Sequence, residues 1–284
     1  MNILITGNKK KRSFYPILDS LNNYFSTNYP NNIIYTDTFV ENKKKDYIYN
    51  DIYSGIVKND LVISIGGDGS ILSAVRRMKN KQIPLLGIHI GNLGFLNQCN
   101  KNNYINTLDD LLNKKKITFN KFFLLESKFL IENKISKKMY SLNDIVINQS
   151  KISRLITLSA FNKGTLINEF SCDGLIIATP LGSTGYSLSA RGPIISPDVK
   201  GVIITPISPH RLSSSPIVVN TNSLIKIKFP KKYYDLYISS DGQESYRILP
   251  NSIVEVKKSK FYAKFVKLPK SNDYFMNLRK KLGW

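Results

Sequence analysis

The segment at residues 62–70, VISIGGDGS, constrains this chain most, because it joins a strand pattern, a glycine-rich turn and a helix start. The apolar residues up to Ile65 are typical of a buried strand, and ILSAVRRM after Ser70 has helical spacing. Glycines let the backbone turn sharply and bring N–H groups close to a phosphate. We therefore expect phosphate to bind at the residues of this turn, which are Gly66, Gly67, Gly69 and Ser70.

Asp68 is the one carboxylate in this turn, and it has almost no side-chain bulk around it. A strand, a glycine turn, an exposed carboxylate and a helix start together indicate phosphate chemistry. The alternative is structural, because short glycine patterns recur in ordinary strand-to-helix turns, where Asp is favoured for its turn propensity. The turn alone leaves both interpretations open.

The first hundred residues alternate strand and helix patterns, which predicts an α/β domain with a mainly parallel, Rossmann-like sheet over residues 1–101. Strand patterns lie at 3–6, 33–35, 61–65 and 84–90, and helical patterns lie at 15–25 and 71–78. Ligands of such sheets bind beyond the carboxyl ends of the strands. Asp68 follows one of those ends.

Residues 102–268 have a different pattern, which predicts an all-β, sandwich-like domain after one helix at 104–112 capped by Asn103. Short β-branched and aromatic runs lie at 119–131, 144–148, 155–161, 166–170, 175–178, 202–205, 217–219, 224–229, 236–239, 253–256 and 261–268. Asn162-Lys163-Gly164 is typical of a hairpin loop. A last helix is expected at 271–281, beginning at Ser271 or Asn272, and we expect 269–284 to pack on the first domain.

Residues 173–193, DGLIIATPLGSTGYSLSARGP, place a dense cluster of small and hydroxyl residues after a buried strand. Such residues leave room for a ligand and offer hydrogen bonds to riboses, base edges or phosphates. A loop can be rich in Ser and Gly merely because it is a loop. Tyr186 amid small residues, with Asp173 at the other end of the strand, fits a nucleoside pocket better.

The formal net charge of +21 comes from 33 Lys and 8 Arg, in basic runs scattered along the whole chain. A nucleic-acid-binding protein is expected to use more Arg and to gather aromatic residues in one patch. We therefore interpret the charge as a solvated surface produced by AT-rich coding, and nucleic-acid binding is kept only as an alternative function.

Cys99 and Cys172 stand alone, so the sequence predicts reduced thiols, no disulfide framework and no zinc cluster. No run approaches the roughly 20 apolar residues of a membrane helix, and the N-terminus does not have the pattern of a signal peptide. We expect a cytoplasmic protein with no membrane partner.

Further blocks accompany the glycine turn and the serine-rich segment in a fixed order from about residue 60 to the end. They are Gly91–Leu96 (GNLGFL), Asn143–Ile147 (NDIVI), Ile204–His210 (ITPISPH), Asp241–Gln243 (DGQ) and Asn277–Trp284 (NLRKKLGW). In these blocks the chain resembles the bacterial NAD kinase family, the ATP-NAD kinases.

The resemblance implies transfer of the γ-phosphoryl group of ATP to the 2′-hydroxyl of the adenosine ribose of NAD, which gives NADP and ADP. It assigns the role of general base to Asp68, because the attacking hydroxyl needs a positioned proton acceptor. It implies ATP at the glycine turn, and Mg²⁺ or another divalent cation carried with ATP, since Mg²⁺ binds through phosphates and keeps several waters. It also implies a homodimer or homotetramer, with contacts made by the β-rich domain.

The NAD contacts of the family carry over to matching positions of this sequence. The resemblance implies that Asp68 and Gly69 meet the reacting ribose, that Phe95 packs against the adenine, and that Asn143 and Thr184 lie on the adenine side. The positions that match contacts to the riboses and the nicotinamide end are Asp144, Asp173, Tyr186 and Ser189. Further matching positions are Gly185, Gln243 and Arg154, and for Arg154 an exposed charge on a strand edge is an equal alternative.

The chain departs from the family pattern at a few positions near this segment. Ser171 and Ser215 stand where members carry Arg, with Arg211 as a substitute for the second, whereas Arg191 stands in place of Gly and Gly185 in place of Ala. The nearest alternative function is a lipid or other small-alcohol kinase, because such enzymes share the GGDG turn. A lipid kinase is expected to lack the blocks at 143–144 and 184–186.

Overall fold

The computed structural model describes residues 1–42, 47–54, 60–91, 94–113, 117–149, 155–211, 213–229, 235–268 and 274–284. These residues form two compact units, Met1–Lys121 with Ala263–Trp284, and Phe122–Tyr262. The domain division expected from the sequence, at residues 101 and 268, stays a prediction. No helix of the described segments is long and apolar enough to cross a membrane.

The first unit is an α/β domain built on parallel strands. Its elements are β1 (Asn2–Gly7), α1 (Phe14–Asn28), β2 (Ile33–Asp37), η1 (Thr38–Val40), β3 (Tyr49–Asn50), β4 (Leu61–Gly66), α2 (Asp68–Met78), β5 (Pro84–His89), β6 (Cys99–Asn100), α3 (Tyr104–Leu112) and α5 (Tyr274–Leu282), with the ends of β7 (Phe119–Ile131) and β18 (Val254–Val266). The strands lie in the order β18-β5-β4-β1-β2-β3, and β6 also pairs with β5. Each of these neighbours runs parallel to the next.

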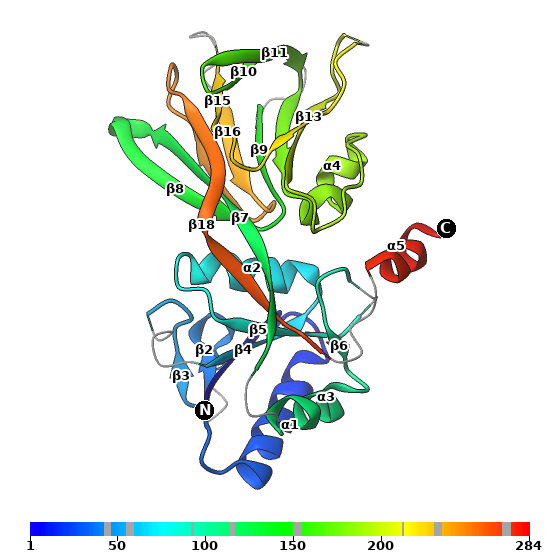
Figure 1. Cartoon of the computed structure of the whole chain (residues 1–284). Helices are drawn as coiled ribbons and strands as arrows, with labels where there is room; N and C mark the ends of the chain where they lie inside the picture. The colour runs from blue at the N-terminus through cyan, green and yellow to red at the C-terminus, as the bar shows by residue number, and fades with distance from the viewer. Residues whose placement is uncertain are drawn as a thin grey trace. The chain divides into compact units, whose positions relative to one another are not determined.

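Helices cover both faces of this sheet, so its central strands are apolar on both sides. All six residues of β4 are buried. Helices α1 and α3 pack on one face through side chains such as Phe14, Leu18 and Leu108. Helix α2 packs against β4 and β1 on the other face, as Figure 1 shows. The glycine turn therefore joins the most buried strand of the sheet to a helix packed on it.

The second unit is a sandwich of two antiparallel sheets. Its elements are β7, η3 (Glu132–Lys134), β8 (Ile135–Ser141), β9 (Asp144–Gln149), β10 (Ile156–Asn162), β11 (Thr165–Cys172), β12 (Gly174–Ala178), η4 (Leu181–Thr184), α4 (Tyr186–Ser189), β13 (Gly201–Ile207), β14 (Ile217–Asn220), β15 (Ile225–Lys228), β16 (Leu236–Ser240), β17 (Glu244–Arg247) and β18. One sheet has the order β11-β10-β15-β18, with β7 and β8 beside β18, and the other has the order β14-β13-β12-β9-β16-β17.

Alternation along β9 decides which side chains of the second sheet face the core. Ile145 and Ile147 lie in the hydrophobic core between the two sheets. Val146 belongs to a second, smaller cluster on the opposite face, with Ile176 of β12. Because side chains alternate along a strand, Asp144 shares that opposite face with Val146. The polar start of β9 is thus directed away from the main core.

The structure confirms the expected fold class, an α/β domain plus an all-β sandwich. The two strands expected at 253–256 and 261–268 are wrong, because β18 is one continuous strand. The residues between the two expected strands are mostly charged, and they belong to the strand, where the Lys258 ammonium lies over the rings of Phe123 and Tyr262. Strands β8 and β17 were not predicted, because their short, charged sequences have no apolar alternation.

Candidate active site

The glycine turn after β4 leads directly into α2. Gly67 is the N-cap of α2, and a Cβ at Gly66 would lie 2.0 Å from the Ser70 hydroxyl oxygen, so only glycine fits there. The helix begins at Asp68, earlier than the start at Ser70 expected from the sequence, because the Gly67 carbonyl already accepts the Ser70 N–H at 2.9 Å. Gly67 and Gly69 are exposed at this positive end of the helix dipole, where an anion is favoured.

The Asp68 carboxylate is held by the loop that follows β5. Its Oδ2 accepts the Phe95 N–H at 2.8 Å. Its Oδ1 accepts the Leu96 N–H and the Asn97 side-chain amide, each at 3.1 Å. A Cβ at Gly94 would lie 1.9 Å from the same Oδ1, so the loop can approach only because residue 94 is glycine. The sequence predicted an exposed carboxylate, whereas Asp68 is half-buried and its carboxylate accepts three hydrogen bonds.

Phe95 is half-buried, and the Lys281 ammonium lies over the face of its ring. The Lys281 ammonium, on the last turn of α5, lies 5.6 Å from the ring centroid, within cation–π range. The block at 277–284 therefore contacts the loop that holds Asp68. Packing of Phe95 against an adenine stays a prediction.

In the second unit, the turn at residues 142–144 is held by Asp241 and Thr179, which directly follow the strands β16 and β12. The Asp241 carboxylate accepts three backbone N–H groups, from Leu142 at 3.0 Å, Asn143 at 2.8 Å and Asp144 at 3.1 Å. On the other side of the turn, the Thr179 hydroxyl donates to the Leu142 carbonyl at 2.7 Å, and the Thr179 N–H donates to the Asn143 carbonyl at 2.8 Å. These bonds on both sides hold the backbone of Asn143 and Asp144 in place.

These two side chains open onto a pocket of about 310 Å³, the size of a small ligand subsite. It is lined by Asn143, Asp144, Val146, Asn148, Tyr186, Ser239, Asp241 and Gly242. The side-chain oxygen of Asn143 is buried and has no hydrogen-bond partner among the described residues. An unpaired buried acceptor in a pocket wall is a group that a bound donor can satisfy.

Asp144 is buried, and its carboxyl makes no hydrogen bond to another residue of the described segments. Burial, and then the nearby Asp241 charge, raise the pKa of Asp144 to about 7. A carboxyl kept near half-ionisation at neutral pH can either donate a hydrogen bond to a ligand or accept one.

The loop from Gly182 to Ser189 packs against the same turn. A Cβ at Gly182 would lie 2.2 Å from the Asn143 carbonyl oxygen, so glycine is required there. A Cβ at Gly185 would lie 3.6 Å from the Asn143 side-chain nitrogen, which places this residue beside the pocket, and Thr184 directly precedes it. Tyr186 is 47% exposed and lines the pocket described above.

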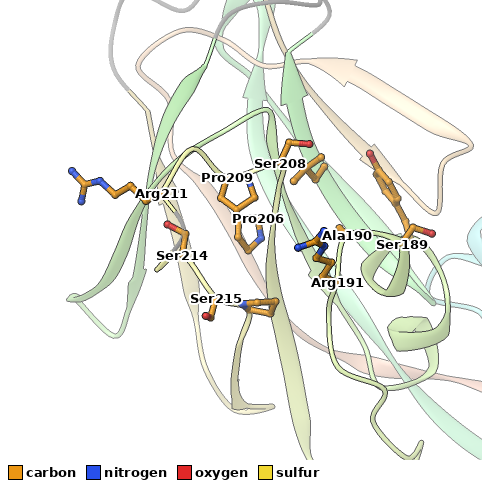
Figure 2. A pocket seen from close by; sticks show the side chains of 12 residues that line it. Ser189, Ala190, Arg191, Pro206, Ser208, Pro209, Arg211, Ser214 and Ser215 are labelled. Atoms are coloured by element: carbon orange, nitrogen blue, oxygen red, sulfur yellow. The ribbon is translucent and has the colours of Figure 1, made fainter.

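Tyr186 and Ser189 also line a second, larger pocket of about 500 Å³ in the same unit (Figure 2). Its other lining residues are Ala190, Arg191, Pro206, Ile207, Ser208, Pro209, Arg211, Ser214, Ser215 and Pro216. Arg191 and Ser215, which depart from the family pattern, therefore lie around one cavity with Arg211, the expected substitute for the Arg replaced by Ser215. Tyr186 is the wall shared by the two pockets.

Asp173 and Gln243, two other expected site residues, are not among the residues that line the two pockets. Asp173 is exposed at the opposite end of β12 from Thr184, where its N–H donates to Ile207. Gln243 is exposed on the turn that contains Asp241, and its N–H donates to the Ser240 carbonyl. Arg154 lies outside the described residues, as do the expected helix caps Ser271 and Asn272.

Sequence reasoning missed the residues that hold the site residues in place. Asn97, Thr179 and Asp241 touch Asp68 or the turn at 142–144, yet none was expected to take part. Asp241 begins the block at 241–243, in which only Gln243 was expected to be a site residue. Its place in that block was the one sequence signal for its role. Nothing in the sequence around Thr179 indicates its role.

Two family models match the chain in order. The ATP-NAD kinase N-terminal domain matches residues 20–117, and the ATP-NAD kinase C-terminal domain matches residues 142–268. Two solved structures share the fold, each at 24% sequence identity and each covering 100% of this chain. They are a yeast NADH kinase in complex with NADH, with a TM-score of 0.90 over 88% of that chain, and an Archaeoglobus fulgidus NAD kinase in complex with ATP, with a TM-score of 0.79 over 99%.

Fold, glycine turn and family models together define an ATP-dependent kinase. Sequence relatives named as NAD kinases identify the family within this class of kinases. An NAD kinase of Wigglesworthia glossinidia brevipalpis is 42% identical over 80% of this chain and 76% of its own length. An NAD kinase of Syntrophotalea carbinolica is 36% identical over 79% and 78%. The chain belongs to the ATP-NAD kinase family.

Proposed function

We propose that the protein phosphorylates the 2′-hydroxyl of the adenosine ribose of NAD with ATP, and that Asp68 is the general base. The observation that carries this proposal is the arrangement of donors around Asp68. A carboxylate offers about four lone-pair sites. Among the described residues, two donors occupy Oδ1 and one occupies Oδ2, which leaves one lone pair of Oδ2 for a substrate hydroxyl.

In the proposed step, the 2′-oxygen of the ribose attacks the γ-phosphorus of ATP, and the bond to the β-phosphate oxygen breaks. The hydroxyl proton passes to Asp68 Oδ2, ADP leaves, and the products are NADP, ADP and one proton. Catalysis of this kind depends mainly on alignment and on stabilising charge, because the transition state is loose. The three donors keep the base in one orientation, which lowers the entropy cost of the step.

The phosphate groups of ATP are assigned to the glycine turn, at Gly66, Gly67, Gly69 and Ser70. The exposed N–H groups at the start of α2 and the positive end of its dipole support this assignment. Among the described residues, no group of three or more His, Cys, Asp or Glu could hold a metal ion. We therefore propose that Mg²⁺ is held chiefly by the phosphates of ATP. In that position it would neutralise charge that develops during the transfer.

The second unit is proposed to recognise NAD. Asn143, Asp144 and Tyr186 share a pocket whose unpaired amide oxygen and near-neutral carboxyl suit ribose hydroxyls or an exocyclic amino group. The other proposed NAD-binding residues are Gly69, Phe95, Arg154, Asp173, Thr184, Gly185, Ser189 and Gln243. We also propose a homodimer or homotetramer in the cytoplasm.

A coupled assay tests the proposal. The full chain is incubated with NAD, ATP and Mg²⁺, and NADP is detected with an NADP-specific dehydrogenase. We expect NADP that depends on both substrates. Folded protein that makes no NADP contradicts the proposal. Parallel incubations with a diacylglycerol or with duplex DNA are expected to give neither a phosphorylated lipid nor salt-sensitive binding.

A further inference from the structure

The second pocket, on which Tyr186 and Ser189 border, carries positive charge that nothing in the described structure neutralises. Arg191 and Arg211 line it, and neither guanidinium makes an ion pair or hydrogen bond with another described residue. No Asp or Glu is among the lining residues. Figure 2 shows the Arg191 side chain directed into the pocket, while Arg211 extends outward at the opposite side.

Hydroxyl groups surround these cations. Ser189, Ser208, Ser214 and Ser215 line the pocket, and none of their hydroxyls is hydrogen-bonded to another residue of the described part of the chain. Guanidinium groups and hydroxyls are the side chains that bind phosphate oxygens, through charge-assisted hydrogen bonds. The two neighbouring pockets thus differ in charge, since Asp144 and Asp241 line the smaller one.

The backbone at Arg191 adds a second observation. Arg191 follows α4 with φ +68°, in the left-handed region that favours glycine. Its N–H donates to Leu188 at 2.9 Å and the Gly192 N–H donates to Ser187 at 2.7 Å, which is the hydrogen-bond pattern of a Schellman motif. Glycine would satisfy this turn without strain. The arginine side chain is therefore present at this position at a conformational cost.

We propose that this pocket is an anion subsite that binds a phosphate or pyrophosphate group of a nucleotide substrate, with Arg191 as the contacting residue and Arg211 at the rim. The pocket volume accommodates a pyrophosphate together with its hydration. Only the identity of the nucleotide rests on the proposed function, because NAD and ATP both carry a pyrophosphate. The binding of an inorganic anion does not depend on it.

The test measures binding of inorganic pyrophosphate to the full chain by calorimetry, at low and at physiological salt. Arg191→Gly is expected to weaken binding about tenfold or more and to raise the melting temperature, because it removes the strained φ together with the charge. Arg191→Lys keeps most of the affinity. Lys163→Gly is the matched control, since Lys163 also has a positive φ, +50°, on the β10–β11 hairpin outside the pocket, and it is expected to bind like wild type.

Wild type that fails to bind pyrophosphate, or Arg191→Gly that binds like wild type, overturns the subsite. Kinetics then identify the source of the phosphate group. If Arg191→Gly has a higher KM for NAD than wild type and the same KM for ATP, the pocket binds the acceptor. If only its KM for ATP is higher, the pocket binds the donor. Pyrophosphate binding that depends on Arg191 in a protein that makes no NADP would support the subsite while contradicting the proposed function.

Discussion

Asp144→Asn removes a buried carboxyl whose ionised form the fold disfavours, so the variant and the wild type should respond differently to pH. Burial and the Asp241 charge raise the pKa of Asp144 to about 7 in the folded protein. An unfolded Asp has a pKa of about 3.9, and a difference of roughly three corresponds to about 4 kcal/mol. Asparagine has nearly the same shape, and the carboxyl makes no side-chain hydrogen bond to a described residue that would be lost.

The sign follows from which state holds the proton more tightly. Between pH 4 and 7 the folded wild type keeps the Asp144 proton that the unfolded chain releases, so wild-type stability falls as pH rises through this range. Asparagine does not ionise. The free energy of unfolding of the variant, relative to wild type, is therefore expected to rise by up to about 4 kcal/mol from pH 4 to pH 8.

Urea unfolding of the full chain at pH 5, 6, 7 and 8 measures this difference. Asp198→Asn is the control in the same unit, because a hydrogen bond from Ser196 lowers the pKa of this exposed carboxyl. Above the ordinary Asp pKa, Asp198 is ionised in both the folded and the unfolded chain. The difference in free energy of unfolding between Asp198→Asn and wild type should therefore stay constant from pH 5 to 8. A constant difference for Asp144→Asn as well would refute the assignment of a raised pKa to Asp144.

Three substitutions test the parts that hold the site. Gly94→Ala places a Cβ 1.9 Å from Asp68 Oδ1, so steady-state turnover should fall at least about a hundredfold. Near-normal turnover would contradict the claim that the loop at 94–97 orients Asp68. Gly185→Ala restores the residue usual in the family, and its Cβ would approach a carbonyl oxygen only to 3.2 Å, so turnover should stay within about threefold of wild type. Thr179→Val removes the hydroxyl that donates a hydrogen bond to the Leu142 carbonyl. Urea unfolding should show a loss of about 1–3 kcal/mol in the free energy of unfolding, and kinetics should show a raised KM for NAD.

Features fixed by neighbouring residues could be predicted from the sequence. The glycine turn at 66–69 and the hairpin at Asn162–Gly164 need only the local conformational freedom of glycine and the strand patterns beside them. Both appear at the expected places, between β4 and α2 and between β10 and β11. The parallel and antiparallel sheets followed from the same periodicity.

Features fixed by distant residues could not be predicted in this way. The donors that orient Asp68 lie 27 to 29 residues further along the chain, and Asp241 is nearly a hundred residues from the turn that it holds. A backbone N–H carries no sequence signal, so a carboxylate that binds three of them cannot be told from a solvated one. The charge around the second pocket likewise depends on Arg191 and Arg211 being brought together by the fold.

The most direct test of the central claim compares Asp68→Asn with wild type in the NADP-forming assay. Asparagine keeps one acceptor oxygen for the loop at 94–97 but has no carboxylate to take the ribose proton. We expect a folded variant whose kcat is lower by about a hundredfold or more, with a much smaller change in the KM for NAD. Asp110→Asn, an exposed carboxyl on α3, should keep wild-type kcat. A kcat for Asp68→Asn within a few-fold of wild type would contradict the assignment of Asp68 as the general base.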